Sequence, residues 1–449
     1  MIALLKLSKF QKSFKEEIKM STAFMTDFYE VTMLQAALKS GKAFDRATFD
    51  LFARKLPEGR RYGVVGGISR AIQAVKDFKY TEEQLEYLAQ NPVIEEETIE
   101  YLRNYTFTGK IMGYKEGDVY FPNSPILTVE GFFGDAVLLE TVLLSILNHD
   151  SAVMSAASRM VVAGQGLPLI EMGSRRTHEE AAVASSRAAY IAGFNATSNM
   201  EAGIRHDIPI TGTSAHAFSL AFADEKEAFK AQVEALGVST TLLVDTYDIE
   251  QGIRNAIEVA GTELGGIRID SGDLHEETVN ARKLLDSLGA VNTKIVLSSD
   301  IDEYTIAEMV DRGTPVNGVG AGTRVVTGSG HPTAGMVFKL VEREGDDGEM
   351  IPVAKKASGK KSAGGLKIAF RTFDEDGKIS GEFYSLHELD VENHPEAHPV
   401  QIVYVEEGKY NIPTIEESRV FHSNILKTLP NSALLTVAGK AEFEVVEIS

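Results

Sequence analysis

The segment from Pro209 to His216 concentrates groups that can hold a phosphate and move a proton. It reads P-I-T-G-T-S-A-H and follows a short apolar approach. A glycine turn with neighbouring hydroxyls can bind phosphate oxygens, and a histidine can transfer a proton or a phosphoryl group near neutral pH. The segment therefore predicts a phosphate-and-proton site where a strand ends.

Five further apolar segments between residues 169 and 326 also end in residues capable of chemistry. In chain order these ends read G-S-R-R (173–176), D-T-Y-D (245–248), D-S-G-D (270–273), S-S-D (298–300) and G-A-G-T (320–323). Charged side chains are seldom buried unless they are paired, so packing alone does not require Asp and Arg at such positions. The recurrence predicts that the six ends belong to one site.

Each cluster taken alone has a less specific interpretation. An arginine pair such as Arg175 and Arg176 is more often a surface or ion-pair feature, and Asp273 is placed to cap the helix that follows it. Residues 320–323 fit a plain glycine turn as well as they fit a phosphate-binding turn. The adjacent Arg324 favours the phosphate-binding turn. The carboxylates that could bind ribose hydroxyls or Mg²⁺ are Asp245, Asp270, Asp273 and Asp300.

A repeated strand-and-helix arrangement must position these ends. The apolar strand centres recur every 23 to 40 residues, with amphipathic segments such as 225–236, 276–288 and 303–310 between them. This is the rhythm of a parallel sheet covered by helices. At least six units, without a G-x-G-x-x-G motif opening a helix, favour an irregular (β/α) barrel with its site at the strand ends over a dinucleotide-binding fold. The strand centres are Ile170, Ile210, Leu243, Ile267, Val296 and Val319.

The chain on either side of this repeat has a different character. Helical spacing from Asp27, strand alternation over 44–54, a capping box at Thr81 and β patterns over 109–130 predict an α+β domain. Beyond about residue 340 the chain mixes short strands, acidic turns and helix. We therefore predict a candidate extra leader at 1–20, an N-terminal α+β domain at 21–135, an α/β barrel at 136–340 and a C-terminal region at 341–449.

Composition limits the class of protein. The chain has 449 residues, 43% hydrophobic and 24% charged, as expected for a soluble protein of two or three domains. A net charge of −20 argues against generic binding to nucleic acid or to an anionic membrane, and the absence of cysteine removes thiolate chemistry. The apolar run Ile2 to Leu5 is too short for a signal peptide or a membrane span. We expect a cytoplasmic protein that acts on small molecules.

Together the motifs resemble those of the nicotinate phosphoribosyltransferase family. The resemblance runs from Thr22 to about residue 440, and several motifs in the same order make it specific. One departure is Met172, which stands where related sequences often have Phe. The matching motifs are T-D-F-Y-E-V-T-M (26–33), L-E-T-V-L-L-S-I-L-N-H (139–149), E-M-G-S-R-R-T-H (171–178), G-T-S-A-H-A (212–217), R-I-D-S-G-D (268–273) and G-V-G-A-G-T (318–323).

The resemblance implies a fold and a reaction. The fold is an irregular α/β barrel with an α+β domain formed from N- and C-terminal segments, in a homodimer whose active sites lie at the subunit interface. The reaction converts nicotinate and 5-phosphoribosyl-1-diphosphate to nicotinate mononucleotide and diphosphate, in NAD salvage. ATP is the implied co-substrate, hydrolysed through a phosphohistidine, and Mg²⁺ is the implied cofactor.

The resemblance also assigns catalytic and phosphate-binding roles. His216 would accept the phosphoryl group, Arg175 would face the ring substrate and the phosphates, and Asp270 would lie at the sugar. These three are the implied catalytic residues. The implied residues for phosphoribosyl diphosphate are Arg268, Asp270, Asp300, Gly320, Gly322 and Thr323.

Four residues are implied to bind nicotinate. Tyr29 would arrive from the partner subunit and stack on the pyridine ring, with Asp27 nearby and Met172 on the ring's other side. Ser214 would read the carboxylate, because a hydroxyl can donate to it. Related nicotinamide enzymes resemble this motif with an Asp in that place, which would repel a carboxylate. Nicotinate is therefore the favoured substrate.

Two alternatives stay open at this point. One is a nicotinamide or other pyridine phosphoribosyltransferase, which belongs to the same class of enzyme. The other is a non-catalytic barrel that binds a sugar phosphate, although the intact set Arg175, His216 and Asp270 argues against it. An aldolase-type barrel would need a Schiff-base lysine at a strand end, and none of the six ends has one.

Overall fold

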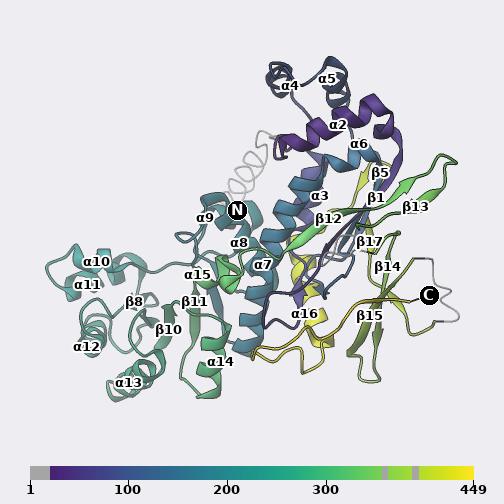
Figure 1. Cartoon of the computed structure of the whole chain (residues 1–449). Helices are drawn as coiled ribbons and strands as arrows, with labels where there is room; N and C mark the ends of the chain where they lie inside the picture. The colour runs from purple at the N-terminus through teal and green to yellow at the C-terminus, as the bar shows by residue number, and fades with distance from the viewer. Residues whose placement is uncertain (1–20, 356–362, 387–393, 449) are drawn as a thin grey trace, which may run out of the picture.

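The computed structural model describes residues 21–355, 363–386 and 394–448. The candidate leader at 1–20 lies outside these residues, as do parts of the predicted C-terminal region. Figure 1 shows two lobes, one with a large antiparallel sheet and one with a parallel sheet flanked by helices, and the long helix α7 (Glu140–Gly164) between them. Within the described ranges no helix is both long and apolar enough to cross a membrane.

The antiparallel sheet of the first lobe takes strands from distant parts of the chain. Its order is β13-β12-β1-β5-β3-β17-β18, and neighbouring strands are antiparallel. β1 (Arg46–Ala53) pairs with β12 (Met336–Glu344), where the rings of Phe49 and Phe338 stack with centroids 4.8 Å apart. The remaining strands are β3 (Lys110–Gly113), β5 (Leu127–Phe132), β13 (Met350–Pro352), β17 (Ile402–Glu406) and β18 (Lys409–Tyr410).

The helices of the first lobe follow the sequence patterns. α2 (Phe28–Ser40) begins directly after Asp27, where the helical spacing starts. α4 (Glu82–Ala89) has the predicted capping box, in which the Thr81 hydroxyl accepts from the Gln84 amide. The other elements here are η1 (Lys42–Phe44), α3 (Ile68–Lys76), α5 (Glu96–Arg103), α6 (Phe133–Val137) and the two-stranded sheet of β2 (Gly63–Val64) and β4 (Val119–Tyr120).

The second lobe contains the predicted parallel repeat. Its order is β7-β6-β11-β10-β9-β8, and all neighbouring strands are parallel. The predicted strand centres Ile267 and Val319 are fully buried, as is Leu297 beside the predicted centre Val296, and this is expected for a parallel sheet covered by helices. The strands are β6 (Leu169–Glu171), β7 (Ala196–Thr197), β8 (Thr241–Leu243), β9 (Gly266–Ile269), β10 (Lys294–Ser299) and β11 (Gly318–Ala321).

Two details of the predicted repeat differ from the structure. Ile210, predicted as a strand centre, forms only an isolated bridge with Thr197, and at 57% exposure its side chain gains little from burial. The short strand β7 was not predicted, because two residues carry no readable alternation. Among the described residues the strands pair in one open order, so closure into a barrel stays a prediction and the observed fold is a mixed α/β fold.

Aspartates start most of the longer helices around the parallel sheet. Asp224, Asp248, Asp273 and Asp302 each accept backbone hydrogen bonds at a helix start, so the capping interpretation of Asp273 is confirmed. The helices of this lobe are α8 (Glu179–Ala192), α9 (Met200–His206), α10 (His216–Leu220), α11 (Glu225–Leu236), α12 (Ile249–Ala260), α13 (Leu274–Ser287), α14 (Glu303–Asp311), α15 (Thr323–Val326) and η2 (Gly328–Gly330).

The C-terminal part of the chain contacts both lobes. A buried ion-pair network, in which Arg371 lies 2.9 Å from Asp118 and 2.7 Å from Glu382, ties its four-stranded sheet to the first lobe. α16 (Ile415–Thr428) packs on α8 of the second lobe. The four strands are β14 (Ile368–Phe373), β15 (Ile379–Ser385), β16 (His398–Pro399) and β19 (Val446–Glu447).

Candidate active site

A cavity of about 690 Å³ opens at the C-terminal ends of the parallel strands, and we name it the strand-end cavity. Parallel pairing explains why separate segments meet there, since β10 sets Ser298 beside Gly320 and β11 sets Ala321 beside Glu171. Residues from five of the six predicted ends line it: G-S-R-R, G-T-S-A, D-S-G-D, S-S-D and G-A-G-T. The structure thus brings five of the six ends together around one cavity, and their shared function stays a prediction.

The predicted ring-binding residue Met172 lies against the glycines of the G-A-G-T turn. A Cβ atom at Gly320 would lie only 2.5 Å from the Met172 sulfur. Any larger residue at position 320 would push Met172 out of the cavity wall. Gly320 therefore lets the Met172 side chain occupy this place in the cavity wall.

His216 is oriented by a buried carboxylate, and the two together form a dyad beside the strand-end cavity. The histidine is the first residue of α10, its side chain is 41% exposed, and its Nε2 atom lies 3.1 Å from Oδ1 of Asp245. The Asp245 side chain is 1% exposed. Because an ionised carboxylate only accepts, the neutral ring donates from Nε2 and keeps its lone pair on Nδ1.

Asp245 also organises the neighbouring strand end. Its second oxygen accepts from the backbone N–H of Asp270 at 2.9 Å and from the hydroxyl of Ser271 at 2.7 Å. Both carboxylate oxygens are thus engaged inside the protein. Three of its roughly four lone-pair positions are used in this way, and direct binding of ribose or Mg²⁺ by Asp245 stays a prediction.

Arg268 joins three of the strand ends. Its Nε donates to the Ser298 hydroxyl at 2.7 Å, and Nη1 lies 3.3 Å from the Thr213 hydroxyl and 3.3 Å from the Ser214 carbonyl. Nη2 lies 3.3 Å from Oδ1 of Asp270, which also accepts from Ser298. The guanidinium therefore shapes the cavity as well as lining it.

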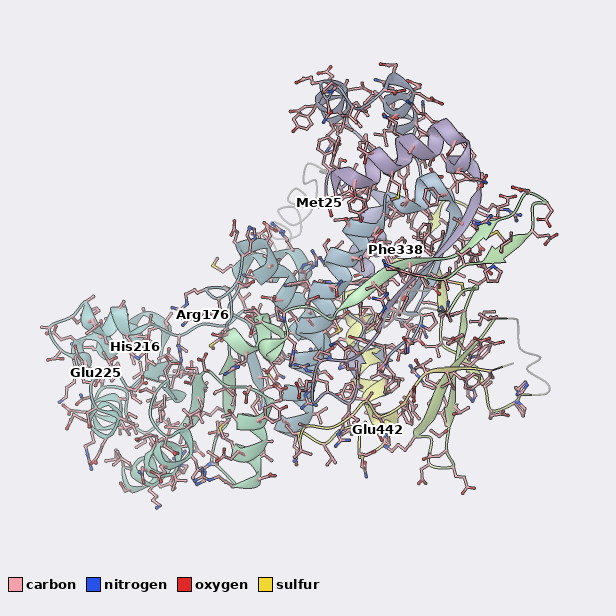
Figure 2. All side chains as sticks on the ribbon, viewed as in Figure 1. Met25, Arg176, His216, Glu225, Phe338 and Glu442 are labelled. Carbon is pink, nitrogen blue, oxygen red and sulfur yellow. The ribbon has the colours of Figure 1, made fainter. Side chains whose placement is uncertain are left out.

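Arg175, Arg176 and Asp300 keep their charged groups available. All three line the cavity and are exposed. Within the described ranges none of them has a side-chain hydrogen bond or an ion pair to another residue of the chain. Figure 2 places Arg176 in the same lobe as His216, whereas Phe338 lies in the other lobe. Unpaired arginines facing a cavity are suited to a carboxylate or a phosphate.

Several predicted residues lie outside the cavity of a single chain. Asp27 and Tyr29 belong to the first lobe, at the start of α2, and do not line the strand-end cavity. Arg324 is exposed on α15 and does not line it either. Ser214, Gly322 and Thr323 do line it, as predicted.

Tyr29 is half-exposed on a firmly anchored helix turn. Glu30 is completely buried, and its carboxylate accepts from the backbone N–H of Thr141 at 2.9 Å and from the Thr141 hydroxyl at 2.8 Å. Burial raises the pKa of Glu30 to about 7. Burial, with the nearby Glu140 carboxylate, raises the pKa of Tyr29 to about 12. The phenol thus stays neutral at physiological pH and presents an aromatic face to the outside.

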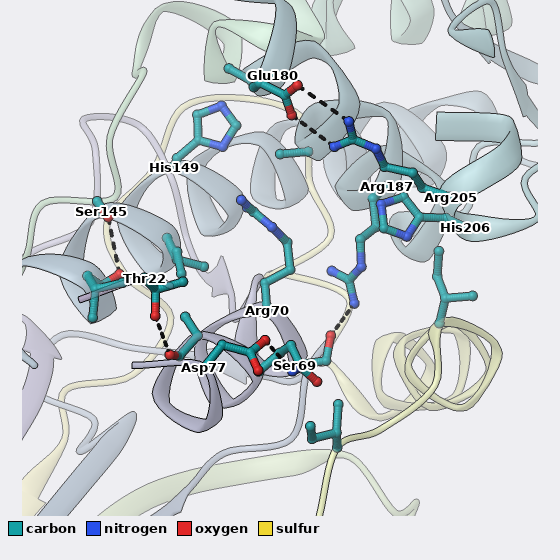
Figure 3. A pocket seen from close by; sticks show the side chains of 18 of the residues that line it. Thr22, Ser69, Arg70, Asp77, Ser145, His149, Glu180, Arg187, Arg205 and His206 are labelled. Carbon is teal, nitrogen blue, oxygen red and sulfur yellow. Dashed lines mark hydrogen bonds and ion pairs between the residues drawn. The ribbon is translucent and has the colours of Figure 1, made fainter. Parts of the chain in front are cut away.

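A second and larger cavity, of about 1320 Å³, lies among α3, α7, α8 and α9, and we name it the inter-lobe cavity. Figure 3 shows Arg70, Arg187 and Arg205 around it. Arg70 lies 2.7 Å from Asp150, Arg187 lies 2.7 Å from Glu116 and Arg205 lies 2.9 Å from Glu180.

The pKa of His206 reflects the electrostatic environment of the inter-lobe cavity. Burial, together with the positive charges of Arg187, Arg70 and Arg205, lowers the pKa of His206 to about 4. The imidazole is therefore neutral at physiological pH. With its three arginines paired and His206 uncharged, this cavity has less binding capacity than its size suggests.

Sequence reasoning missed several serines that line the strand-end cavity. Ser298 and Ser299 belong to the S-S-D end, and Ser174 follows Gly173, so all three stood in clusters that the sequence had marked. Ser198 follows β7, which is too short to leave a pattern. The pairing of His216 with Asp245 spans 29 residues, and only the strand-end rule could have suggested it.

Comparison with known proteins agrees with this geometry. Residues 24–148 match the family described as the nicotinate phosphoribosyltransferase (NAPRTase) N-terminal domain. The chain is 52% identical over 387 residues to a nicotinate phosphoribosyltransferase of Mycobacterium tuberculosis, covering 84% of this chain and 82% of that protein. It is 39% identical over 383 residues to the nicotinate phosphoribosyltransferase of Bacillus subtilis, covering 83% and 77%. The crystal structure of human nicotinic acid phosphoribosyltransferase superposes with a TM-score of 0.80 at 25% identity, covering 94% and 97% of the two chains.

Proposed function

The chain belongs to the nicotinate phosphoribosyltransferase family, and from this premise we propose that it makes nicotinate mononucleotide and diphosphate from nicotinate and 5-phosphoribosyl-1-diphosphate. The observation that carries the proposal is the strand-end cavity, where the unpaired Arg175 and Arg176 share one space with Asp270 and the G-A-G-T turn. Both substrates are anions, so free arginines beside a glycine turn suit them. The product would enter NAD salvage.

The chemistry is a displacement at the anomeric carbon of the ribose. The pyridine nitrogen forms a C–N bond as the C–O bond to diphosphate breaks, so positive charge develops on the sugar and negative charge on the leaving group. Within the described ranges one carboxylate oxygen of Asp270 has no side-chain partner, and it would stabilise the sugar. Arg175 would stabilise the departing diphosphate. Most of the acceleration would come from positioning and electrostatics.

Nicotinate would bind at the wall formed by Met172 and Ser214. Ser214 would donate its hydroxyl to the carboxylate, and Met172 would pack on one face of the ring. In a homodimer, Tyr29 of the partner subunit would cover the other face, with Asp27 of the partner subunit beside it. The exposed, neutral ring of Tyr29 supports such a role, because no tyrosine or phenylalanine among the described residues of one chain lines the cavity.

The phosphate groups of 5-phosphoribosyl-1-diphosphate would bind at the ends of β10 and β11. Gly320, Gly322 and Thr323 would hold the 5′-phosphate, and Arg268 and Asp300 would face the rest of the molecule. Mg²⁺ usually binds through one or two carboxylates together with substrate phosphates, and Asp270 and Asp300 fit that pattern. The described residues contain no cluster of three or more ligands that would hold a metal alone. When bound, Mg²⁺ would neutralise charge on the diphosphate.

His216 would couple ATP hydrolysis to the transfer. Its Nδ1 lone pair would attack the γ-phosphorus of ATP, forming a P–N bond while the bond to ADP breaks. Asp245 would stabilise the positive charge that this step places on the ring. Water would later take the phosphoryl group and release phosphate. The dyad geometry supports this role.

Product identification tests the proposal directly. The purified protein is incubated with nicotinate, phosphoribosyl diphosphate, Mg²⁺ and ATP, and nicotinate mononucleotide is sought by mass spectrometry. A parallel reaction with nicotinamide distinguishes the related pyridine enzymes. Faster turnover of nicotinamide would contradict the choice of substrate, and binding of both substrates without product would favour a non-catalytic role.

A second test concerns ATP coupling. His216→Ala is expected to abolish stimulation by ATP and phosphorylation of the protein by γ-labelled ATP, while slow transfer without ATP persists. His275→Ala serves as the control, because this histidine hydrogen bonds Thr314 at 2.7 Å and lines neither cavity. ATP stimulation that survives in His216→Ala would refute the phosphohistidine.

A further inference from the structure

Glu171 is a buried carboxylate directly behind the strand-end cavity. It is the last residue of β6 and is 1% exposed. Among the described residues no Lys, Arg or His forms an ion pair with it, although buried carboxylates are normally paired with a cation. Its retention here points to a role that an apolar residue could not fill.

Three neutral donors from three elements compensate this charge. The backbone N–H of Gly173 donates to Oε1, and the hydroxyls of Ser186 in α8 and Thr197 in β7 lie 2.7 Å and 2.6 Å from Oε2. An ionised carboxylate accepts without donating, so it suits three converging donors. A single side chain thereby joins a loop, a helix and a strand.

The groups held by Glu171 are those that build the cavity. A Cβ atom at Gly173 would lie 2.8 Å from Oε1, so the 172–176 loop passes directly over the carboxylate. Thr197 is followed by Ser198, whose backbone N–H donates to the Glu171 carbonyl at 2.8 Å. Asn199 ties the same two segments again through its side-chain N–H₂, 3.0 Å from the Ser174 hydroxyl.

We propose that Glu171 is a positioning residue, which holds the 172–176 loop against the end of β7 in the arrangement that binds nicotinate. The inference rests on the proposed function, because it gives this loop the residues that contact the substrate. Arg175 has no partner of its own in the described part of the chain, so only the loop backbone fixes its direction. Loss of the carboxylate frees that backbone and displaces Arg175 and Met172 together.

Two substitutions of Glu171 test the proposal. Glu171→Gln keeps the shape but cannot accept three hydrogen bonds as two ionised oxygens do, and Glu171→Ala removes them all. We expect kcat/KM for nicotinate to fall about tenfold in Glu171→Gln and on the order of 100-fold in Glu171→Ala. KM for phosphoribosyl diphosphate should change less than about threefold, since its predicted residues lie at the ends of β9 to β11 and outside the 172–176 loop.

Glu225→Gln is the matched control. Glu225 is also buried in the second lobe without an ion pair in the described ranges, and it accepts from Asn255 at 3.1 Å. It lies on α11 and does not line the strand-end cavity. We expect its kcat/KM for nicotinate to stay within about twofold of the wild type.

Hydrogen exchange provides a readout that does not depend on activity. Exchange in peptides spanning 172–176 should rise in both Glu171 variants and stay unchanged in Glu225→Gln. If wild-type protein makes no nicotinate mononucleotide, the proposed function fails, whereas the exchange result still decides the positioning role.

Three outcomes would overturn the inference. One is a folded Glu171→Ala with wild-type kcat/KM for nicotinate. Another is an equal loss for both substrates that merely follows the unfolded fraction. The third is unchanged exchange at 172–176. If Glu171→Ala does not fold, the isosteric Glu171→Gln decides by the same measurements.

Discussion

The strand-end cavity and the inter-lobe cavity contain similar residue types but use their charges differently. In the inter-lobe cavity Arg70, Arg187 and Arg205 each face a carboxylate of the protein. In the strand-end cavity Arg175 and Arg176 face the open space, without a partner in the described ranges. The inter-lobe cavity is nearly twice as large, at about 1320 Å³ against about 690 Å³. Unpaired arginines therefore distinguish the candidate active site better than cavity volume does.

This difference implies two kinds of response to mutation. A paired, buried arginine stabilises the fold, and its loss leaves a carboxylate buried without a partner. An unpaired arginine contributes little to folding and acts when an anion arrives. Changes in the inter-lobe cavity should alter stability and leave turnover intact, and changes in the strand-end cavity should do the reverse.

The largest effect is expected for Arg187→Ala in the inter-lobe cavity. This substitution leaves Glu116 buried without its cation and should reduce the free energy of unfolding by about 3 to 5 kcal/mol. Urea unfolding measures the loss, and kcat of the folded fraction should stay within about twofold of wild type. A large fall in kcat with an unchanged free energy of unfolding would contradict the contrast between the two cavities.

The next effect is expected for Arg175→Ala in the strand-end cavity. Loss of this unpaired guanidinium should lower kcat/KM by roughly 10² to 10³, which corresponds to about 3 to 4 kcal/mol of transition-state stabilisation. Steady-state kinetics measure it, and the unfolding free energy should change by less than about 0.5 kcal/mol. Arg205→Ala is the matched control and should leave kcat/KM nearly unchanged. Equal kinetic losses in the two variants would contradict the contrast.

The pH dependence of stability sharpens the comparison further. The pKa of His206 is lowered to about 4 in the folded protein, so between pH 6.5 and 4 the unfolded chain binds a proton that the folded chain does not. Stability is therefore lost as pH falls through this window, by roughly 2 to 3 kcal/mol from this residue. Urea unfolding at pH 7 and at pH 4.5 measures this loss. Between these two pH values the free energy of unfolding should fall less in His206→Gln than in the wild type. An identical fall in the unfolding free energy of the wild type and the variant would exclude His206 as its cause.

The smallest effect concerns Asp245, which hydrogen bonds within the protein as the inter-lobe carboxylates do but contacts His216 of the proposed site. Asp245→Asn should lower ATP-stimulated turnover by about tenfold, because an amide no longer stabilises a positively charged His216. Comparison of initial rates with and without ATP measures this. Asp273→Asn is the control, since Asp273 caps α13. A fall in ATP-independent transfer as large as the fall in stimulated turnover would place Asp245 in another role.

Much of the strand-end cavity could be predicted because its chemistry sits where strands end. Arg175, Ser214 and Asp270 stand directly after apolar runs, so local pattern and parallel pairing were sufficient to bring them together. The resemblance to a known family added roles that spacing alone does not provide. The capping role of Asp273 was also predictable, since a helix pattern follows it at once.

The remaining features depend on contacts between distant segments. The three arginine pairs of the inter-lobe cavity join residues 25 to 80 positions apart, and sequence spacing says nothing about such meetings. β7 was missed because two residues have no period, and Ile210 was over-interpreted because an apolar residue after a proline resembled a strand. The hydrogen bonds from uncharged donors to Glu171 could not be predicted from the sequence, because the donors come from three separate elements.

The pairing of β1 with β12 determines the order in which the two lobes can be completed during synthesis. Ala47 of β1 pairs with Arg343 of β12, almost 300 residues later, whereas the strands of the parallel sheet all lie between these partners. A ribosome therefore releases every strand of the second lobe before the first lobe has its full sheet. We expect the parallel lobe to fold first and the edge of β1 to stay open until β12 emerges. The lobe that contains the candidate active site would thus fold before the antiparallel sheet of the first lobe is complete.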